Sequence, residues 1–204
     1  MYKVNFMAPA HLPKISCTIF IFLLFQLLNA QKLNFDVILF GNKIGHTIIE
    51  RIVKNDSITQ YKLNSSSEVT IFFTKKTSHM NFDVLYKNGK LFSAYVKNVK
   101  DGVTEIVNIM WQDTKYIIER GEERLQMLQP LDFSAILLYF TEPLNRTKIF
   151  SERMGEYANF VKTGTHQYEC KTANGVNNIY RYKDGKLVEL EMNKGASVFM
   201  RLAQ

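Results

Sequence analysis

The sequence predicts a mainly β fold: a curved antiparallel meander sheet, forming a half-barrel or open barrel, with one buried central helix. From Leu33 onward, apolar side chains recur with a period of two, which is the spacing of β-strands. Four Asn-Gly or Asp-Gly pairs interrupt this pattern, beginning with Asn88-Gly89, and such pairs are the strongest short-range signal of a β-hairpin. One stretch, Pro130–Pro143, departs from the period of two and has a helical spacing instead.

The expected strands follow one another along the chain and are joined by short polar connections. One of these connections is the polar run Asn64–Ser67, which is predicted to be a turn. The strands are expected at residues 34–40, 44–53, 58–63, 69–73, 82–86, 91–99, 103–111, 115–119, 157–162, 166–171, 176–182, 187–192 and 197–202.

The central helix is predicted from the spacing of its apolar residues and from its two ends. Four apolar side chains, from Phe133 to Phe140, fall at i, i+3, i+4 and i+7, which places them on one face of a helix. Asp132 is expected to cap the first turn, and Pro143 to end the segment. Because the other face is apolar too, this helix is expected to be covered by the sheet.

Some strands carry apolar side chains on both faces, as in Phe35–Phe40. Such strands must be covered twice, by the helix on one face and by the far wall of a curled sheet or a bound apolar ligand on the other. We hypothesise that Phe35, Trp111, Phe133 and Leu137 line a ligand site. Packing of these aromatic and aliphatic side chains in the core is the alternative.

Met1–Ala30 is predicted to be an export signal peptide. Lys3 and Lys14 precede the apolar run Ile15–Leu28, and acidic residues are absent from this stretch. Cleavage after it would leave residues 31–204 as a single β-rich domain, periplasmic or secreted. Retention of the apolar run as an anchor is the alternative. After cleavage, no transmembrane segment is expected.

The charge of the chain argues against a nucleic-acid partner, and its cysteine content argues against an internal disulfide. The net charge of +7 is mild, and the basic residues are scattered between apolar ones, so no nucleic-acid partner is expected. Once Cys17 leaves with the signal peptide, Cys170 is alone and no internal disulfide is expected. Cys170 is expected to be a small apolar residue within a strand.

No catalytic constellation and no metal site are predicted. His46, His79 and His166 lie in three separate segments without metal-ligand spacing, and each is expected to be solvated or hydrogen-bonded. The chain has no Gly-x-Ser-x-Gly elbow, phosphate-binding glycine loop or Cys-x-x-Cys pair. Glu122-Glu123 and the arginines beside it are expected to form a charged hairpin tip. We therefore expect no cofactor and predict that the chain is not an enzyme.

Several short motifs, taken in order, carry a resemblance. Phe35–Gly41 followed by Ile44-Gly45 resembles the opening hairpin of secreted bacterial families classed as domains of unknown function. Leu131–Phe140 is similar to their central Asp-(Leu or Phe)-Ser-(Ala or Ser) segment, and the closing hairpin at Asp184–Leu187 and the strand at Phe199–Leu202 fit as well. These families look distantly like the half-barrels of periplasmic lipoprotein carriers. The resemblance implies an envelope protein of Gram-negative bacteria.

Three functions remain open at this point. The leading hypothesis is a non-enzymatic secreted or periplasmic β-domain that binds a lipid or other apolar ligand, or another envelope component, in its curved sheet. The first alternative is a scaffold for an envelope protein, in which an exposed sheet edge pairs with a partner strand. The second is an enzyme with a dispersed site around His79 or His166.

Overall fold

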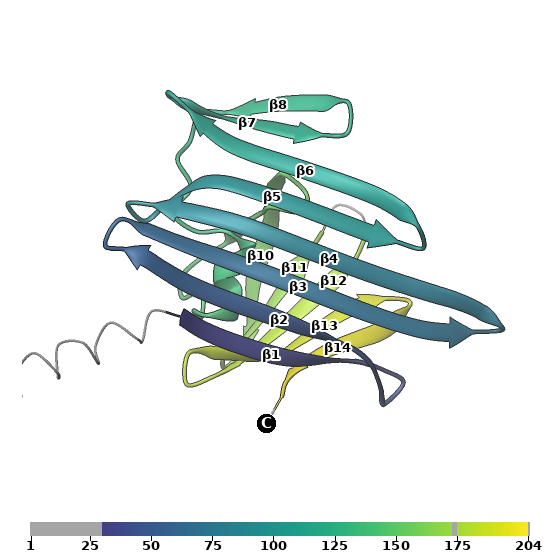
Figure 1. Ribbon diagram of the computed structural model, residues 1–204. Coiled ribbons are helices and arrows are strands. Elements are labelled where there is room, and N and C mark those ends of the chain that lie inside the picture. Colours follow the sequence, from purple (N-terminus) through teal and green to yellow (C-terminus); the bar gives the residue numbers. More distant parts are fainter. Residues whose placement is uncertain (1–29, 173–174, 204) are drawn as a thin grey trace, which may run out of the picture.

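The computed structural model describes residues 30–172 and 175–203. Apart from Ala30, the predicted signal peptide lies outside the described residues. The described chain forms one antiparallel sheet of 14 strands (Figure 1). The strands are β1 (Ala30–Leu39), β2 (Asn42–Asn55), β3 (Ile58–Ile71), β4 (Thr74–Lys87), β5 (Lys90–Lys100), β6 (Val103–Gln112), β7 (Lys115–Arg120), β8 (Glu123–Met127), β9 (Lys148–Ser151), β10 (Glu156–Gly164), β11 (Gln167–Lys171), β12 (Asn177–Lys183), β13 (Lys186–Lys194) and β14 (Ala196–Leu202).

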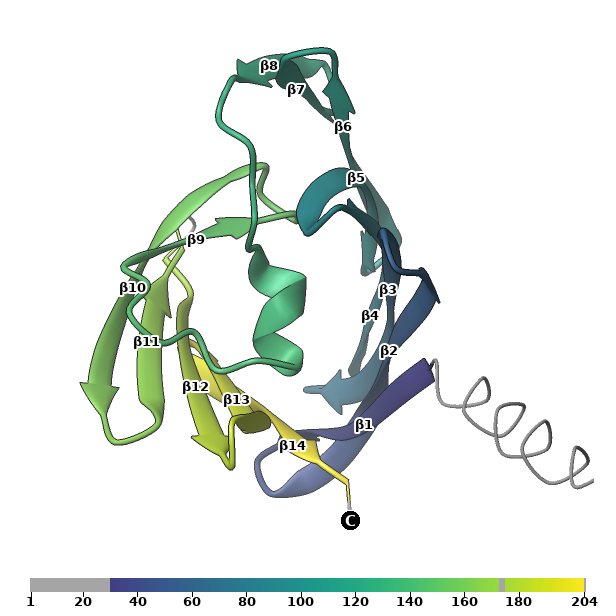
Figure 2. The same cartoon turned by 90° about the vertical axis from the view of Figure 1, so that its left-hand side faces the viewer.

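The sheet is a meander that curls into an open barrel. Strands that follow one another in sequence pair side by side from β1 to β8 and from β9 to β14, and β1 pairs with β14, for example through Val37 and Met200. The two edges, β8 and β9, are not paired with each other, and the curl leaves the barrel open between them (Figure 2). The predicted antiparallel meander and its open-barrel shape are confirmed.

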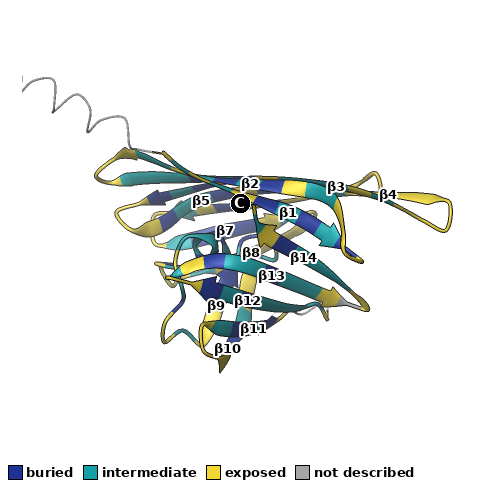
Figure 3. Ribbon diagram, turned by 90° about the horizontal axis from the view of Figure 1, so that it is seen from below, coloured by how far each residue is buried: buried dark blue, intermediate teal, exposed yellow. Residues whose placement is uncertain are grey.

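Alternation of burial along the strands gives the sheet an inner and an outer face (Figure 3). The inward side chains of both halves form one core, which includes Ile49 and Val84 from the first half and Phe160 and Leu190 from the second. Removing one such side chain from water stabilises the fold by about 1.5–3 kcal/mol. Strands with two apolar faces were expected to be covered on both. The outward face of β1 and its turn is not fully covered, since Ile38 is half-buried and Phe40 is exposed.

The connection from β8 to β9 passes through the inside of the curl, where it forms the 3₁₀ helix η1 (Ala135–Tyr139) (Figure 2). Ile136 and Leu138 of η1 are buried in the core. Within the described residues, no helix is both long enough and apolar enough to cross a lipid bilayer.

The prediction of a buried central helix over Pro130–Pro143 is wrong. Ser134 is extended, with φ −143° and ψ 176°, and it forms a parallel bridge with Phe150 of β9, so a helix cannot begin before it. Asp132 does not cap, because its carboxylate lies 3.3 Å from the guanidinium of Arg146. The segment is apolar on all sides because the sheet surrounds it, and this burial produced the apolar spacing that suggested a helix.

The predicted turn at Asn64–Ser67 is also wrong, because β3 runs through it. These polar side chains are matched across the strands: Ser65 lies 2.7 Å from the hydroxyl of Thr47, and the Asn81 amide donates to Asn64. Gly45 on β2 makes the pairing close, since a Cβ there would lie 2.1 Å from the Ser66 carbonyl oxygen. The chain reverses farther along instead, between β3 and β4.

Candidate functional site

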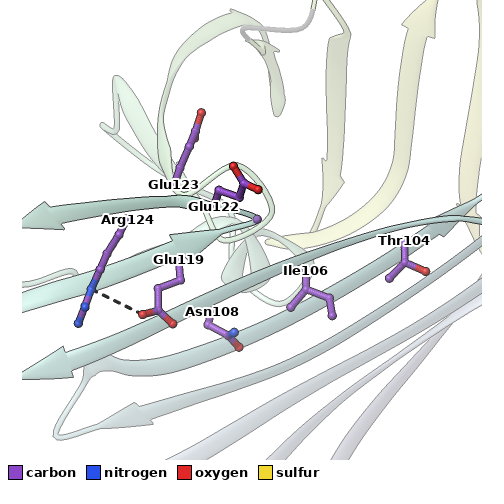
Figure 4. A pocket seen from close by; sticks show the side chains of 8 residues that line it. Thr104, Ile106, Asn108, Glu119, Glu122, Glu123 and Arg124 are labelled. Carbon is purple, nitrogen blue, oxygen red and sulfur yellow. Dashed lines mark ion pairs between the residues drawn. The ribbon is translucent and has the colours of Figure 1, made fainter.

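A long hollow follows the outward face of β6. Two adjoining hollows of about 540 and 640 Å³ share Asn108 and Glu119, and together we call them the outer groove. Figure 4 shows one end, where Thr104, Ile106 and Asn108 lie along β6. They point outward because Val107 and Ile109, which alternate with them, are buried in the core.

The floor of the outer groove contains several apolar side chains, with Asn108 between Ile106 and Met110. Three of these apolar side chains are exposed: Tyr95 of β5, and Ile106 and Met110 of β6, of which Met110 is 48% exposed. Ile117 of β7 also lines the groove but is itself buried. Leu85 of β4 continues this surface. On a sheet with one wet face, these positions are normally polar. We therefore take the outer groove as the candidate binding surface of this sheet.

Polar pairs border the floor of the outer groove. At one end, the Arg124 guanidinium lies 3.6 Å from Glu119, as the dashed line in Figure 4 indicates. Toward the other end, the Gln60 amide donates to Asp83 over 2.5 Å. Both contacts are exposed to solvent, and an exposed ion pair such as Arg124–Glu119 contributes little to stability.

A second hollow, of about 710 Å³, lies between β5–β7 and the turn that joins β9 to β10. Its lining is more strongly charged than the outer groove: the buried Asn98 amide donates to Glu105 over 3.0 Å. Arg120 ties the two halves of the curl together by donating to the Met154 carbonyl oxygen and pairing with Glu123. The predicted charged hairpin tip is thus present, and one of its arginines bridges the opening between the sheet edges.

A buried polar cluster holds η1 in place. The Glu152 side chain is fully buried, and its Oε1 accepts hydrogen bonds from the Ser134 hydroxyl and the Ile136 N–H. The N–H of Ala135 also interacts with this carboxyl group. The Tyr86 hydroxyl lies 2.6 Å from Ser134 Oγ. Burial raises the pKa of Glu152 above its ordinary value, and these hydrogen bonds offset the shift only in part. The Glu152 carboxyl group thus caps the first turn of η1, the role that was predicted for Asp132.

Two tyrosines anchor the segment at either end of η1. The Tyr116 hydroxyl donates to the Leu91 carbonyl oxygen over 2.6 Å and accepts from the Leu131 N–H over 3.2 Å. The Tyr182 hydroxyl donates to the Leu138 carbonyl oxygen over 2.9 Å. These buried hydrogen bonds satisfy backbone groups that no strand pairs, so the segment is a structural part of the interior.

The predicted lining residues lie around this segment. Phe35 is fully buried, and its ring centroid is 5.9 Å from that of Tyr139 in an edge-on contact. Trp111 is half-buried and contacts Tyr116 edge-on at 4.7 Å. Both side chains belong to or pack against the core.

Phe133 and Leu137 lie four residues apart in the same interior segment. Both are half-buried against the core, and the Arg146 guanidinium lies over the Phe133 ring at 4.2 Å. Neither these two residues nor Phe35 and Trp111 line the outer groove, the hollow beside Arg120 or the hollow at His46. Their role in ligand binding stays a prediction.

His46, His79 and His166 are not placed to bind one metal ion together. His46 and His79 line one small hollow of about 160 Å³, where Ser66 Oγ lies 3.1 Å from His79 Nδ1. They lie on β2 and β4 with β3 between them, and two strand spacings of about 4.8 Å each are too wide for shared metal ligation. His166 pairs with Glu142 at 2.9 Å. The described residues contain no group of three His, Cys, Asp or Glu side chains placed to hold a metal ion.

Cys170 is buried and free within the described part of the chain, as expected for a small apolar residue in a strand. Burial raises the pKa of its thiol to about 11. At neutral pH the thiolate fraction is therefore very small, and the residue lacks the character of a reactive nucleophile.

The outer groove was only partly visible in the sequence. Tyr95 is one of several aromatic residues in the central strands, whereas Ile106 and Met110 were not singled out as candidate binding residues. A partial signal was present: β6 carries Val107 and Ile109 on one face, and Ile106 and Met110 on the other face beside Thr104 and Asn108. The Glu152 cluster had no sequence signal, because its members come from distant elements.

Residues 35–203 match the family described as a domain of unknown function, DUF6134. The chain belongs to this family. The expectation of a family of unknown function is confirmed. The likeness to lipoprotein carriers stays a prediction.

No curated protein sequence matches this DUF6134 chain. A solved structure, the beta-barrel-like protein of domain of unknown function DUF1849 from Brucella abortus, is similar at 12% sequence identity with a TM-score of 0.45. The alignment covers 87% of this chain and 97% of that chain.

Proposed function

We propose that the protein is a non-enzymatic, periplasmic or secreted binding domain that holds an extended apolar ligand of the cell envelope in its outer groove. The observation that carries this proposal is the set of exposed apolar side chains, Tyr95, Ile106 and Met110, which lie on the outward face of the sheet around Asn108. Small-molecule sites combine apolar lining with a few placed polar groups, and the outer groove has both.

The dimensions of the outer groove suit a long, narrow ligand. Its lining runs along β6 from Thr104 to Gln112, a span of eight residues, or about 26 Å at roughly 3.3 Å per residue. An extended acyl chain could lie along this floor, while its polar head meets the Arg124–Glu119 pair at one end.

The interior of the curl supports an outer position for the ligand. Ile136 and Leu138 of η1 occupy the inside of the sheet and are buried among the core side chains. A ligand there would have to displace η1 and break the hydrogen bonds that Glu152 and Tyr182 make to it. Binding on the outer face carries no such cost.

The test is native mass spectrometry of protein purified gently from its own envelope fraction, together with titration of a fluorescent long-chain fatty acid. We expect a reproducible added mass that organic extraction removes. Met110→Lys places a charge on the floor of the outer groove and should lower the added mass and weaken the fatty-acid probe by roughly tenfold or more, because covering an unpaired charge is costly. The matched control is Leu144→Lys, at an exposed apolar residue outside the outer groove.

Two results would count against the proposal. The wild-type protein could carry no added mass and fail to bind the probe, which would leave the outer groove without an apolar ligand. Alternatively, Met110→Lys and Leu144→Lys could retain the same ligand equally, which would place the binding site elsewhere.

A second candidate function, a protein-interaction scaffold, is favoured by the free edge of β8. Its residues Glu123–Gln126 are exposed, and β8 pairs on one side only, with β7. An unpaired strand edge is a ready template for a partner strand. Cross-linking in the native envelope tests it: a stoichiometric protein partner, together with a protein free of added mass, would favour the scaffold over the ligand carrier.

A further inference from the structure

The hairpin of β3 and β4 extends beyond the rest of the sheet (Figures 1 and 3). The last residue of β3 paired with β2 is Ser67, and β4 first pairs with β5 at Ser78. Residues 68–77 therefore form a two-stranded arm without a neighbouring strand on either side, which we call the β3–β4 arm. Its four residue pairs project by about 13 Å at roughly 3.3 Å per residue.

The tip of the β3–β4 arm consists of two exposed phenylalanines. Phe72 and Phe73 are 93% and 102% exposed, and neither packs against the core. Both have left-handed backbone conformations, with φ of 46° and 64°. A two-residue hairpin turn of this kind strongly favours Asn-Gly, since a β-carbon is strained there. The two phenylalanines therefore stabilise this turn less well than Asn-Gly would, and their presence is not explained by the fold.

The base of the β3–β4 arm is held in a defined direction. The Asp101 carboxylate accepts a hydrogen bond from the Thr77 N–H over 2.9 Å, and the Asp101 N–H donates to the Thr77 carbonyl oxygen. This hydrogen bond also lowers the pKa of Asp101 below its ordinary value. An isolated two-stranded hairpin is marginal in water, so these contacts keep the tip presented away from the sheet.

Two lysines, their paired carboxylates and further apolar side chains surround the tip. Lys75 and Lys76 follow the phenylalanines within three residues, and their ion pairs with Glu68 and Asp101 are exposed and therefore weak. In a meander, alternate turns lie at the same end of the sheet, so the β1–β2 and β5–β6 turns share this end. Each offers a further exposed apolar side chain, Phe40 and Val103 respectively.

We propose that the β3–β4 arm inserts into the surface of a lipid bilayer that contains anionic phospholipid. Phe72 and Phe73 enter the boundary between headgroups and acyl chains, and Lys75 and Lys76 meet the phosphate groups. A convex tip without a surrounding flat face or groove matches a fluid interface, which needs no complementary shape, better than it matches a protein surface. Aromatic side chains and nearby cations are the usual combination at such interfaces. This inference stands independently of the outer groove.

The decisive variant is Phe72→Asn with Phe73→Gly, because it removes both rings while giving the turn its preferred sequence. It should unfold at the same temperature as the wild-type protein or higher. The assay is flotation with vesicles of phosphatidylcholine alone or mixed with phosphatidylglycerol. It uses the chain from Ala30 onward, which contains every described strand and lacks the apolar run Ile15–Leu28.

We expect the wild-type chain to float with the mixed vesicles and the double variant to partition about 100-fold more weakly, because two phenyl rings lose their apolar contact. Leu128→Ser is the matched control: Leu128 is also exposed but follows β8 at the opposite end of the sheet, so its loss should change nothing. Lys75→Gln with Lys76→Gln should remove the preference for anionic vesicles.

Either of two outcomes overturns the proposal. The folded wild-type chain could remain unbound to both kinds of vesicle, which would mean that the exposed rings serve something other than a bilayer. The wild-type chain and the Phe72→Asn/Phe73→Gly variant could instead float equally, which would place any membrane contact elsewhere on the molecule.

Discussion

Replacing Glu152 tests whether a buried carboxyl group anchors the interior segment. In Glu152→Ala, the N–H groups of Ala135 and Ile136 lose their acceptor in a site closed to solvent. Each unsatisfied buried donor costs about 1–3 kcal/mol, and the lost side-chain volume leaves a cavity. We therefore expect the free energy of unfolding to fall by roughly 3–5 kcal/mol.

Glu152→Gln separates the acceptor from the charge, because the amide keeps one oxygen and cannot ionise. Burial raises the folded-state pKa of Glu152 above its unfolded value of about 4.3. The folded protein then binds this proton more tightly than the unfolded chain, so the wild-type protein gains stability as the pH falls through the folded pKa. The slope is up to about 1.4 kcal/mol per pH unit between the two pKa values. Glu152→Gln should lose this slope.

The tyrosines that face Glu152 do not titrate in the pH range of this prediction. Tyr86, Tyr139 and Tyr180 interact with it electrostatically, and the pKa of each is raised by burial, so all three stay neutral across the range. Urea unfolding from about pH 5 to pH 8 measures the effect. The fluorescence of Trp111, the sole tryptophan, can follow unfolding because the side chain is half-buried against Tyr116.

Parallel stability profiles would refute the reasoning. If the wild-type protein and Glu152→Gln change equally with pH, Glu152 has the same pKa in the folded and unfolded states and is not desolvated as described. If Glu152→Ala unfolds at the same urea concentration as the wild-type protein, the carboxyl group does not anchor η1.

Two further predictions concern the sheet and its acid stability. Gly45→Ala should lower the free energy of unfolding by about 3 kcal/mol in urea melts, because the new Cβ meets the Ser66 carbonyl oxygen at 2.1 Å; an unchanged midpoint would contradict this close approach. Burial raises the pKa of Glu142, but hydrogen bonds from Tyr168 and His166 outweigh it, so the net shift is downward. This group therefore stabilises the fold above its unfolded pKa, and the stability is lost as the pH falls through the folded pKa. Glu142→Gln should cost about 1–2 kcal/mol near neutral pH and little in acid, and an equal cost at both would exclude the carboxylate as the cause.

Local features of the sequence were enough to predict the sheet. Asn88-Gly89, Asp101-Gly102 and Asp184-Gly185 each form a turn with a left-handed backbone, as their residue types favour. These signals depend only on adjacent residues. The alternation between them set which side chains of a strand such as β5 face inward, so the meander could be predicted, although β8 and β9 were missed and β3 was divided into two strands.

The same local signals failed where distant elements supplied the missing partner. Ser65 and Asn64 resemble a turn until Thr47 and Asn81 are placed beside them on the neighbouring strands. Phe133–Phe140 resembles a helix until Glu152, from a later turn, is seen to cap a much shorter one. In both cases a polar contact across the fold decided between two conformations that the local residues allow.

By itself, the sequence determined the antiparallel meander, the positions of most turns and the inward faces of the strands. Only the tertiary structure decided that the sheet stays open between β8 and β9, that η1 occupies its interior, and that Tyr95 and Met110 come together on the outside. The reason is physical: turns and alternation depend on neighbouring residues, whereas curvature, packing and grooves depend on side chains that the fold brings together from strands far apart in the chain.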